Sequence, residues 1–577
     1  MKNMLKYIRE YKREAVLGPL FKLFEATIEL SVPLVIAAII DNGIANGTDG
    51  KGYVIKMCLL LILLGAAGLA FSATAQYFAA KASVGYVTKL RYALFEHIGK
   101  LSHTEIDTLG TSTMITRMTS DANQIQTGLN LALRLLLRSP FVVFGAMIMA
   151  FTIDWKPALA FLAVIPALSA VVFGIMLISM PLYKKTQARV DGVLSKTREN
   201  LLGVRVIRAF CREDSEISEF EEKNDALTAS QKFVGRISAL TNPMTYVLIN
   251  LAILWLIHIS AIRTYDGIIS QGMVIALYNY MSQILVELIK LANLIITITK
   301  SVAAAGRINA VFEIKSSLED GKQKNGADSE YSVVFSDVSL KYKNSGAPSL
   351  TDISFKIKRG DTVGIIGGTG SGKTSLVNLI CRFYDVSSGV VLIDGADVRT
   401  YTKEALRKKI GIVPQKATLF SGSVRDNMRW GKSDADDEEI YSALKTAQIK
   451  EVIVENGGLD FKIMQGGANL SGGQKQRLAI ARTLVMQPEI LILDDSSSAL
   501  DYATDAHLRQ AIRNMQGERT VFIVSQRASS IMHADKIIVL DDGEAVGIGT
   551  HDELLSSSEV YREIYLSQFD GEVRKNA

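Results

Sequence analysis

Hydrophobic residues form long runs in the first 300 positions of the chain. One of them, residues 158–181, contains no Asp, Glu, Lys or Arg. A helix that crosses a bilayer needs about 20 mostly apolar residues. The runs therefore predict six membrane-spanning helices with a tight turn at residues 154–157 between the third and fourth. Their approximate bounds are Val16–Ile40, Val54–Ala80, Leu131–Ile153, 158–181, Pro243–Ile262 and Met273–Ile298.

Basic residues between these runs predict how the spans are oriented. Segments 81–130 and 181–242 carry five and eleven Lys or Arg, whereas segments 41–52, 154–157 and 263–272 carry one each. Because cytoplasmic loops are enriched in Lys and Arg, the two long loops and both termini are expected on the cytoplasmic side. The long loops are expected to continue the helices, which would place Arg134 and Arg138 below the bilayer. Basic residues interleaved with Leu5 and Ile8 predict a short amphipathic surface helix before a retained anchor.

The second half of the chain has a different pattern. A polar segment at residues 316–332 is typical of a linker, and after it short Val/Ile-rich runs alternate with Gly turns and helical stretches. This alternation predicts an α/β domain with a largely parallel sheet. Its buried strands are expected at Val363–Ile366, Val390–Ile393, Ile490–Leu493 and Val521–Val524. The predicted domains are a helical membrane domain at 1–315, a linker at 316–331 and an α/β domain at 332–577.

Composition narrows the class of protein. Hydrophobic residues make up 48% of the 577-residue chain and charged residues 21%, which excludes a disordered, collagenous or disulfide-rich secreted protein. The net charge of +5 is compatible with nucleic acid or an anionic membrane surface. The basic residues lie beside apolar runs, so we expect a membrane and no nucleic acid. The three isolated cysteines predict neither a metal site nor a disulfide framework.

A glycine-rich loop carries the first candidate chemistry. Residues 367–374 read GGTGSGKT and match G-x-x-x-x-G-K-[ST], between the apolar segment TVGIIG and the helical segment SLVNLICRFY. Such glycines let backbone N–H groups converge on phosphate oxygens at a helix N-terminus. Lys373 is then expected to reach the β- and γ-phosphates and Thr374 to bind Mg²⁺. Asp494 ends an aliphatic run, which is common by itself, but with this loop upstream it is expected to hold the same Mg²⁺.

The segment Leu470–Gln474 reads LSGGQ, which a plain glycine turn before a helix does not explain. Gln415 in IVPQ, residues 498–501 (SALD) and Tyr342 complete a pattern over about 332–570 that resembles the ATP-binding cassette (ABC) family. The resemblance implies that the aromatic ring stacks on adenine and that LSGGQ binds the ATP held by the opposite cassette. It implies Mg²⁺ at Thr374, Gln415 and Asp494. It implies ATP binding by Tyr342, Gly367, Gly368, Thr369, Gly370, Ser371, Gly372, Lys373, Thr374, Ser375, Gln415, Ser471, Gly472, Gly473 and Gln474.

Six spans before one cassette resemble an ABC exporter half-transporter of the type IV fold. The fold class expected from this resemblance is an all-α six-helix transmembrane domain followed by an α/β P-loop ABC ATPase domain. Two cytoplasmic segments resemble the coupling regions of such exporters. They are residues His103–Thr113 and Glu199–Glu213.

Two candidate catalytic positions depart from the family pattern. Asp495 follows the Asp494 strand where most ABC ATPases have Glu, and Gln526 stands where they have His. Asp is one methylene shorter than Glu, and a misplacement of about 1 Å can cost about 10²-fold in rate. Gln526 cannot carry positive charge. The pair resembles the degenerate subunit of heterodimeric exporters, whose partner has the Glu and the His. The alternative is that both are tolerated local substitutions.

Carboxylates inside the spans leave two interpretations open. Glu25 and Glu29 lie four residues apart on one helical face, and intramembrane carboxylates normally face protein or an aqueous cavity. They either form a site for cationic amphipathic substrates, or they bond to a neighbouring helix or lie near the cytoplasmic edge of the span. Glu287 and Lys290, three apart, are expected to neutralise each other.

The most favoured function is ATP-driven efflux of drugs or other amphipathic compounds across the cytoplasmic membrane, with ATP and Mg²⁺ as cofactors. The chain would act as one half of a heterodimer with a second ABC half-transporter. The alternatives are a dedicated peptide or lipid exporter and a homodimeric exporter. A channel-like or regulatory membrane ATPase is less favoured because the linker is short, and an importer because the two parts are fused.

Overall fold

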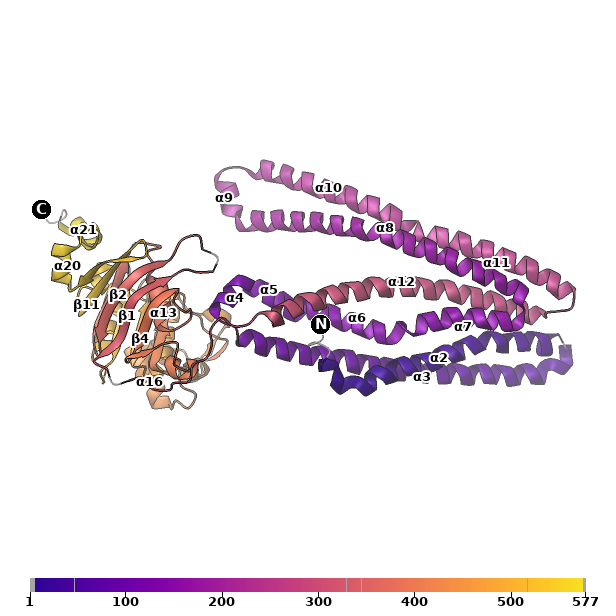
Figure 1. The fold of residues 1–577 in the computed structure, drawn as a ribbon, viewed down its shortest axis with the longest axis horizontal. Coiled ribbons are helices and arrows are strands. Elements are labelled where there is room, and N and C mark those ends of the chain that lie inside the picture. The colour runs from indigo at the N-terminus through magenta and orange to yellow at the C-terminus, as the bar shows by residue number, and fades with distance from the viewer. Residues whose placement is uncertain (1–5, 46, 328, 344, 516, 574–577) are drawn as a thin grey trace. The chain divides into compact units, whose positions relative to one another are not determined.

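The computed structural model describes residues 6–45, 47–327, 329–343, 345–515 and 517–573. Its contacts divide the chain into two compact units, which are described separately (Figure 1). The helical unit contains the residues up to Gly99 together with Ser112–Ile314. The second unit contains Lys100–Thr111 together with the residues from Lys315 onward.

Six helical segments of the described residues are long and apolar enough to cross a membrane. The six predicted spans are therefore confirmed, and each segment extends well beyond the predicted apolar run. Helix α3 (Lys51–Gly99), for example, continues 19 residues past the predicted end of the second span at Ala80. The long loops do continue the helices, as expected. The six segments are Lys6–Ile44, Lys51–Gly99, Thr111–Ile153, Trp155–Leu202, Glu213–Tyr265 and Gln271–Glu313.

The first span begins with a 3₁₀ turn, η1 (Lys6–Tyr11). It is followed by α2 (Lys12–Ala38), which ends in a π-helical turn, η2 (Ile39–Ile44). Tyr11, with φ −105° and ψ 22°, separates η1 from α2, so the short surface helix expected at the N-terminus stays a prediction. Its first residues, 2–5, lie outside the described residues.

The hydrogen-bond pattern of the third span is interrupted near its start, although Leu136 and Leu137 keep right-handed helical backbone angles. Helix α6 (Ala122–Leu135) ends two residues before α7 (Arg138–Ile153). Pro140 lies in the first turn of α7 and has no N–H to bond to the Leu136 carbonyl, so a break at this point costs little. Asp154 alone connects α7 to α8 (Trp155–Leu202), and its side chain accepts a bond of 3.2 Å from the Lys156 N–H. The expected turn is thus a single capping residue.

Helices α2, α7, α8, α11 (Thr241–Tyr265) and α12 (Gln271–Glu313) of this unit share one apolar core. Helix α8 runs alongside α10 (Glu213–Ala239) and α11, to which the short α9 (Val204–Ala209) connects it (Figure 1). Helix α12 packs against α2, α6 and α7. The fully buried Tyr280 of α12 donates a bond of 2.6 Å to the Leu30 carbonyl of α2. Small residues such as Ala26 and Ala146 let these helices approach closely.

The second unit contains two larger sheets. The six-stranded sheet has the order β12-β11-β3-β10-β9-β6, in which only β12 is antiparallel to its neighbour. The four-stranded antiparallel sheet has the order β2-β1-β4-β5. The strands are β1 (Tyr331–Leu340), β2 (Leu350–Lys358), β3 (Thr362–Gly367), β4 (Ser388–Ile393), β5 (Ala396–Asp397), β6 (Ile410–Val413), β9 (Ile490–Asp494), β10 (Thr520–Val524), β11 (Lys536–Asp541) and β12 (Glu544–Gly549).

Three of the four expected strands lie in the parallel sheet, as β3, β9 and β10. The fourth, Val390–Ile393, belongs to β4 and pairs antiparallel with β1, so its expected place in the parallel sheet is wrong. β4 is only half-buried, whereas every residue of β9 and β10 is buried. A four-residue Val/Ile run fits either environment, and only the pairing distinguishes them.

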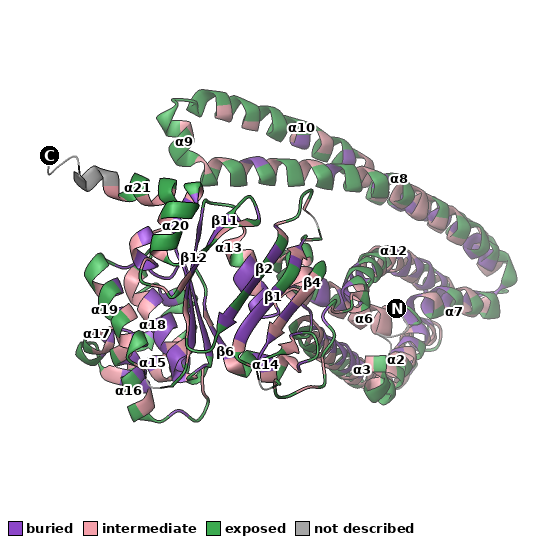
Figure 2. Ribbon diagram, turned by 60° about the vertical axis from the view of Figure 1, so that its left-hand side comes forward, coloured by how far each residue is buried: buried purple, intermediate pink, exposed green. Residues whose placement is uncertain are grey.

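Helices cover both sheets and create two hydrophobic cores. In one core, β1, β2 and β4 pack against β3 and α13 (Lys373–Ile380). In the other core, α15 to α19 pack against strands of the six-stranded sheet. Figure 2 shows the buried residues along the strands. The other helices are α14 (Lys403–Lys409), α15 (Val424–Arg429), α16 (Asp437–Thr446), α17 (Lys450–Glu455), α18 (Gly472–Val485), α19 (Tyr502–Arg513), α20 (His551–Ser557) and α21 (Glu559–Val573).

Candidate functional site

The glycine-rich loop connects β3 to α13. Gly370 and Gly372 have φ angles of 89° and 94°, in the left-handed region that favours glycine. A Cβ atom at Gly372 would lie 2.7 Å from the Ser349 carbonyl oxygen. Both the backbone conformation and the space therefore require glycine at this position. The strand, loop and helix have the order that the motif predicts.

Lys373 folds back over this loop. Its Nζ atom donates to the carbonyl oxygens of Gly367 at 3.0 Å and Gly368 at 2.5 Å, and lies 3.3 Å from Ser371 Oγ. Burial lowers the pKa of the Lys373 ammonium, so an anion beside it would be strongly favoured. The loop thus places one ammonium group beside the N-terminus of α13, and both groups favour a phosphate ligand.

Thr374 and Asp494 form the second part of the site. The threonine Oγ1 atom lies 3.1 and 3.3 Å from the two carboxylate oxygens of Asp494. Burial raises the pKa of Asp494. A hydroxyl and a carboxylate are the hard oxygen ligands that Mg²⁺ accepts when phosphate oxygens and waters supply the rest. The described residues contain no group of three or more His, Cys, Asp and Glu that could hold a metal alone.

Asp495 is held between two amide side chains. Its Oδ2 atom accepts bonds from Nε2 of Gln415 at 3.1 Å and Nε2 of Gln526 at 3.5 Å. These three residues follow β9, β6 and β10, whose carboxyl ends meet at one edge because the strands are neighbours and parallel. Burial raises the pKa of Asp495, the direction that suits a general base.

One cavity of about 240 Å³ collects most of the predicted residues. Ser349 and Val524 also line it and were not predicted from the sequence. Tyr342 does not line the cavity, but its hydroxyl donates a bond of 3.0 Å to Ser375 Oγ, which does. Gly367, Gly368 and Ser371 shape the loop without lining the cavity. The predicted residues that line it are Thr369, Gly370, Gly372, Lys373, Thr374, Ser375, Gln415, Asp494, Asp495 and Gln526.

The LSGGQ segment lies apart from this cavity. Ser471 caps α18: its Oγ accepts from the Gln474 N–H at 3.3 Å, and Gln474 Oε1 accepts from the Ser471 N–H at 3.0 Å. Ser471 and Gly472 are exposed. A Cβ atom on Gly473 would lie 3.0 Å from the Ala499 carbonyl, so the segment packs against residues 498–501. The N-terminus of α18 is therefore an exposed surface of the kind that binds anions, and its residues do not line the cavity that contains the phosphate loop.

A short helix between two of the membrane-spanning segments, α4 (His103–Leu109), packs within the second unit. The His103 ring stacks on Phe383 with centroids 4.5 Å apart, and Tyr384 donates a bond of 2.6 Å to Asp107. The Tyr384 ring also makes an edge contact with Tyr342 at 4.9 Å. These contacts were missed from the sequence. The available signal was an adjacent pair of aromatic residues directly after the P-loop helix.

Packing of α4 should weaken as the pH falls. Burial, with a smaller contribution from Arg407, lowers the pKa of His103 below its ordinary 6.5, against the opposing effect of Asp107. The packed state therefore binds fewer protons than the unpacked one below pH 6.5, so the stabilisation is complete above that pH and is lost below it. The protection factors of amides 103–109, which correct for the slower intrinsic exchange at lower pH, should fall between pH 7.5 and about 5.5. His103→Phe keeps the stacking, and its exchange protection should not fall in this way; the same pH effect in this variant would contradict the assignment.

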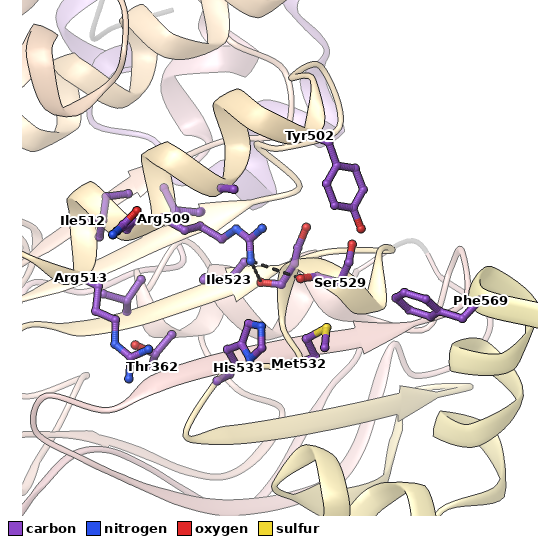
Figure 3. Close-up of a pocket in the computed structure, with 16 residues that line it drawn as sticks. Thr362, Tyr502, Arg509, Ile512, Arg513, Ile523, Ser529, Met532, His533 and Phe569 are labelled. Atoms are coloured by element: carbon purple, nitrogen blue, oxygen red, sulfur yellow. Dashed lines mark hydrogen bonds between the residues drawn. The ribbon is translucent and has the colours of Figure 1, made fainter. Parts of the chain in front are cut away.

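A second cavity, of about 460 Å³, lies between α19, residues 529–534 and α21 (Figure 3). Arg509 Nη1 donates to the carbonyl oxygens of Ser529 and Ser530 at 3.2 and 3.1 Å. Tyr502 and Phe569 lie toward one end of it (Figure 3). No predicted site residue lines this cavity, so it is separate from the candidate nucleotide site.

Comparison with known proteins assigns both halves of the chain. Residues 16–288 match the ABC transporter transmembrane region family, and residues 350–498 match the ABC transporter family. An ABC transporter ATP-binding protein of Mycobacterium bovis is 36% identical over 572 residues, covering 98% of this chain and 97% of its own length.

Two further relatives have more specific names. YgaD of Bacillus subtilis, provisionally named a multidrug export ATP-binding/permease protein, is 31% identical over 98% of this chain and 99% of its own. The ATP-dependent lipid A-core flippase of Desulfotalea psychrophila is 30% identical over 95% and 99%. A bacterial Atm1-family ABC exporter with ATP bound has the same fold, with a TM-score of 0.80 at 24% identity over 96% of this chain and 98% of its own.

The fold and these matches define a multi-pass membrane transporter with an attached ATPase domain. The chain belongs to the ABC transporter family, as an exporter half-transporter of the type IV fold. The expected fold class is confirmed, and the ABC ATPase domain implies nucleotide binding. Such exporters act as dimers within the membrane.

Proposed function

We propose that this protein uses ATP and Mg²⁺ to export drugs or other amphipathic compounds across the cytoplasmic membrane, as one half of a heterodimer. One observation carries the proposal. A single cavity collects Lys373, the Thr374–Asp494 pair and Asp495, while the exposed LSGGQ segment lies outside it. A phosphate site and a signature segment that do not meet within one chain require a second cassette.

The roles of the side chains follow from their positions. Lys373 and the loop N–H groups would bind the β- and γ-phosphates, and Thr374 with Asp494 would hold Mg²⁺, which neutralises charge that develops during phosphoryl transfer. Gln415 and Gln526 would orient Asp495 and the attacking water. Ser471 and the N-terminus of α18 would complete the site of the partner cassette. Two cassettes would then close on ATP and separate after hydrolysis.

Asp495 and Gln526 support a weakly active site in this chain. Burial already raises the pKa of Asp495, so the proton affinity of its carboxylate suits a general base. What limits this residue as a base is its side chain, which is one methylene shorter than that of Glu. Gln526 can donate a hydrogen bond but cannot supply charge. We therefore propose that the partner supplies the Glu and the His, and that its site does most of the hydrolysis.

Basic residues in the cytoplasmic loops support an orientation with the ATPase domain and both termini in the cytosol. The provisional multidrug name of one relative supports drugs as substrates. The name of the lipid A-core flippase keeps a lipid exporter as the second candidate. A homodimer remains the alternative assembly, in which two weak sites would share the work.

The proposal is tested by comparing two single variants in the purified complex with the partner half-transporter. Ser471→Ala removes a donor from the competent site, so ATP turnover should fall about 10²- to 10³-fold. Asp495→Asn acts on the weak site and should change turnover by less than about twofold. Mg²⁺-dependent phosphate release measures both.

The matched control is Ser498→Ala, which removes a hydroxyl that bonds within its own turn, at 2.8 Å from the Asp495 carbonyl oxygen. It should retain more activity than Ser471→Ala. If Asp495→Asn abolishes turnover and Ser471→Ala does not, the two sites are assigned the wrong way round. Full activity of the chain without any partner would contradict the heterodimer.

A further inference from the structure

A groove of about 560 Å³ lies between α2 and α3 in the helical unit. Leucines of α3 form much of its apolar surface, and Ile28 and Val32 extend that surface along α2. Four polar side chains interrupt it: Glu25, Glu29, Ser72 and Arg138. The groove therefore combines a long apolar wall with one cluster of charge, within two predicted membrane spans.

Both carboxylates have basic partners. Lys22 Nζ donates to Glu25 Oε2 at 2.5 Å and to Ser72 Oγ at 3.1 Å. Arg138 Nη2 donates to Glu29 Oε2 at 2.5 Å. The ion pair between Glu29 and Arg138 of α7 is the bond to a neighbouring helix that one interpretation expected, so a site for cationic substrates requires that the paired carboxylates keep accessible oxygens. Pairing offsets the cost of removing each charge from water.

The carboxylates are more accessible than their partners. The side chains of Lys22 and Arg138 are each 7% exposed, whereas Glu25 is 18% and Glu29 is 40% exposed. Arg138 is held from its other side by Glu287 at 2.7 Å. The basic groups thus lie behind the acidic ones, and the surface offered to a ligand is acidic although the cluster is nearly neutral.

Two features make this surface suitable for a ligand. A charged side chain that faces hydrocarbon is costly, so Glu29, which is 40% exposed in the single chain, is expected to face water or a polar group rather than lipid. Gly65 and Gly68 also leave room in the wall of α3. A Cβ atom added at Gly65 would have no neighbour within 4 Å, and one at Gly68 would only touch Ile28 at 4.0 Å.

We propose that this groove binds lipophilic ammonium compounds and that these are substrates of the exporter, which rests on the proposed function. The ammonium would donate to the accessible oxygens of Glu29 and Glu25. Its alkyl or aromatic part would lie along Ile28, Val32 and the leucines of α3. Recognition would depend on one positive charge joined to an apolar body.

The binding step is tested without ATP on the full chain in phosphatidylcholine nanodiscs. The probe is a dansyl-labelled octyl chain that ends in a free ammonium, and its N-acetylated form supplies a neutral counterpart. Fluorescence titration should show that the ammonium form binds at least about tenfold more tightly, as expected for one charged hydrogen bond. Glu29→Gln should remove most of this difference, because Gln keeps the shape and an acceptor for Arg138 but not the charge.

Two pairs of variants distinguish the effect of the carboxylate charge from the effect of the groove volume. Glu14→Gln is the control for charge, since Glu14 is also a paired carboxylate of α2, with Lys81 at 2.9 Å, but does not line the groove. It should leave the selectivity unchanged. Gly65→Leu fills the groove and should weaken both probes, whereas Gly174→Leu, at another open helical position, should weaken neither. Unchanged unfolding temperatures will show that the variants remain folded.

Equal binding of the two probes, or unaltered selectivity in Glu29→Gln, would overturn the site. Export of the ammonium probe by the partnered complex should also fall at least about fivefold in Glu29→Gln, with ATP turnover retained. Normal export by this variant would overturn the substrate assignment. Charge-selective binding in a protein that exports nothing would instead refute the proposed function and leave the site intact.

Discussion

Replacing Asp495 with Glu and Gln526 with His together should raise the ATP turnover of the purified chain about 100-fold. The pocket already holds Lys373, the Thr374–Asp494 pair and Gln415, so binding groups are in place. The site lacks a carboxylate long enough to contact the attacking water and a side chain that can carry positive charge at position 526. Glu extends the carboxylate by one methylene toward the attacking water, and His can carry the positive charge that Gln526 lacks. Phosphate release at saturating Mg²⁺ and ATP measures the gain.

A gain of activity is informative because misfolding cannot produce it. The matched control combines the same two changes with Ser471→Ala, which should lower the gain again if two copies of this chain complete each other's sites. Asp495→Glu alone should give an intermediate rate. If the double variant is no faster than the natural chain, Asp495 and Gln526 are tolerated substitutions, and the deficit proposed for this site does not exist.

Arg138→Met should destabilise the helical unit by about 3–5 kcal/mol. Arg138 on α7 donates to Glu29 of α2 at 2.5 Å and to Glu287 of α12 at 2.7 Å, so it joins three helices. Methionine keeps the apolar length but leaves two carboxylates without their shared partner. Glu287 is 3% exposed and would depend on Lys290 and Ser139 alone. Thermal unfolding in detergent should show a large loss.

Two further variants serve as references for the loss of stability in Arg138→Met: one breaks an exposed ion pair, and the other removes the carboxylate left unpaired. Lys408→Met breaks a pair with Glu404 in which both side chains are at least 75% exposed, and it should leave the unfolding temperature almost unchanged. Adding Glu287→Leu to Arg138→Met removes the buried carboxylate and should restore much of the stability. A loss for Arg138→Met no larger than for Lys408→Met would contradict the proposed three-helix link.

Local sequence motifs predicted most of the candidate nucleotide site. The loop at 367–374 and Asp494 could be placed because the required residues are contiguous or end a strand. Gln415, Asp495 and Gln526 lie 80 and 31 residues apart, yet they meet because their strands are parallel neighbours. Tyr384 and Asp107 are separated by 277 residues, and nothing local links a loop between spans to the P-loop helix. Their contact could not be predicted from either segment alone.

The sequence by itself determined the six spans and the three buried strands β3, β9 and β10, because the period and length of an apolar run are properties of contiguous residues. It also determined the residue types of the phosphate loop. Only the tertiary structure decided that Arg138 lies buried between Glu29 and Glu287, because these partners are 109 and 149 residues away in the sequence. It likewise decided that β4 joins the antiparallel sheet and that Lys22 lies behind Glu25. Ion pairs and strand pairing depend on which segments, far apart in the sequence, pack against each other. The hydrophobic pattern of one segment predicts only that one of its faces is buried.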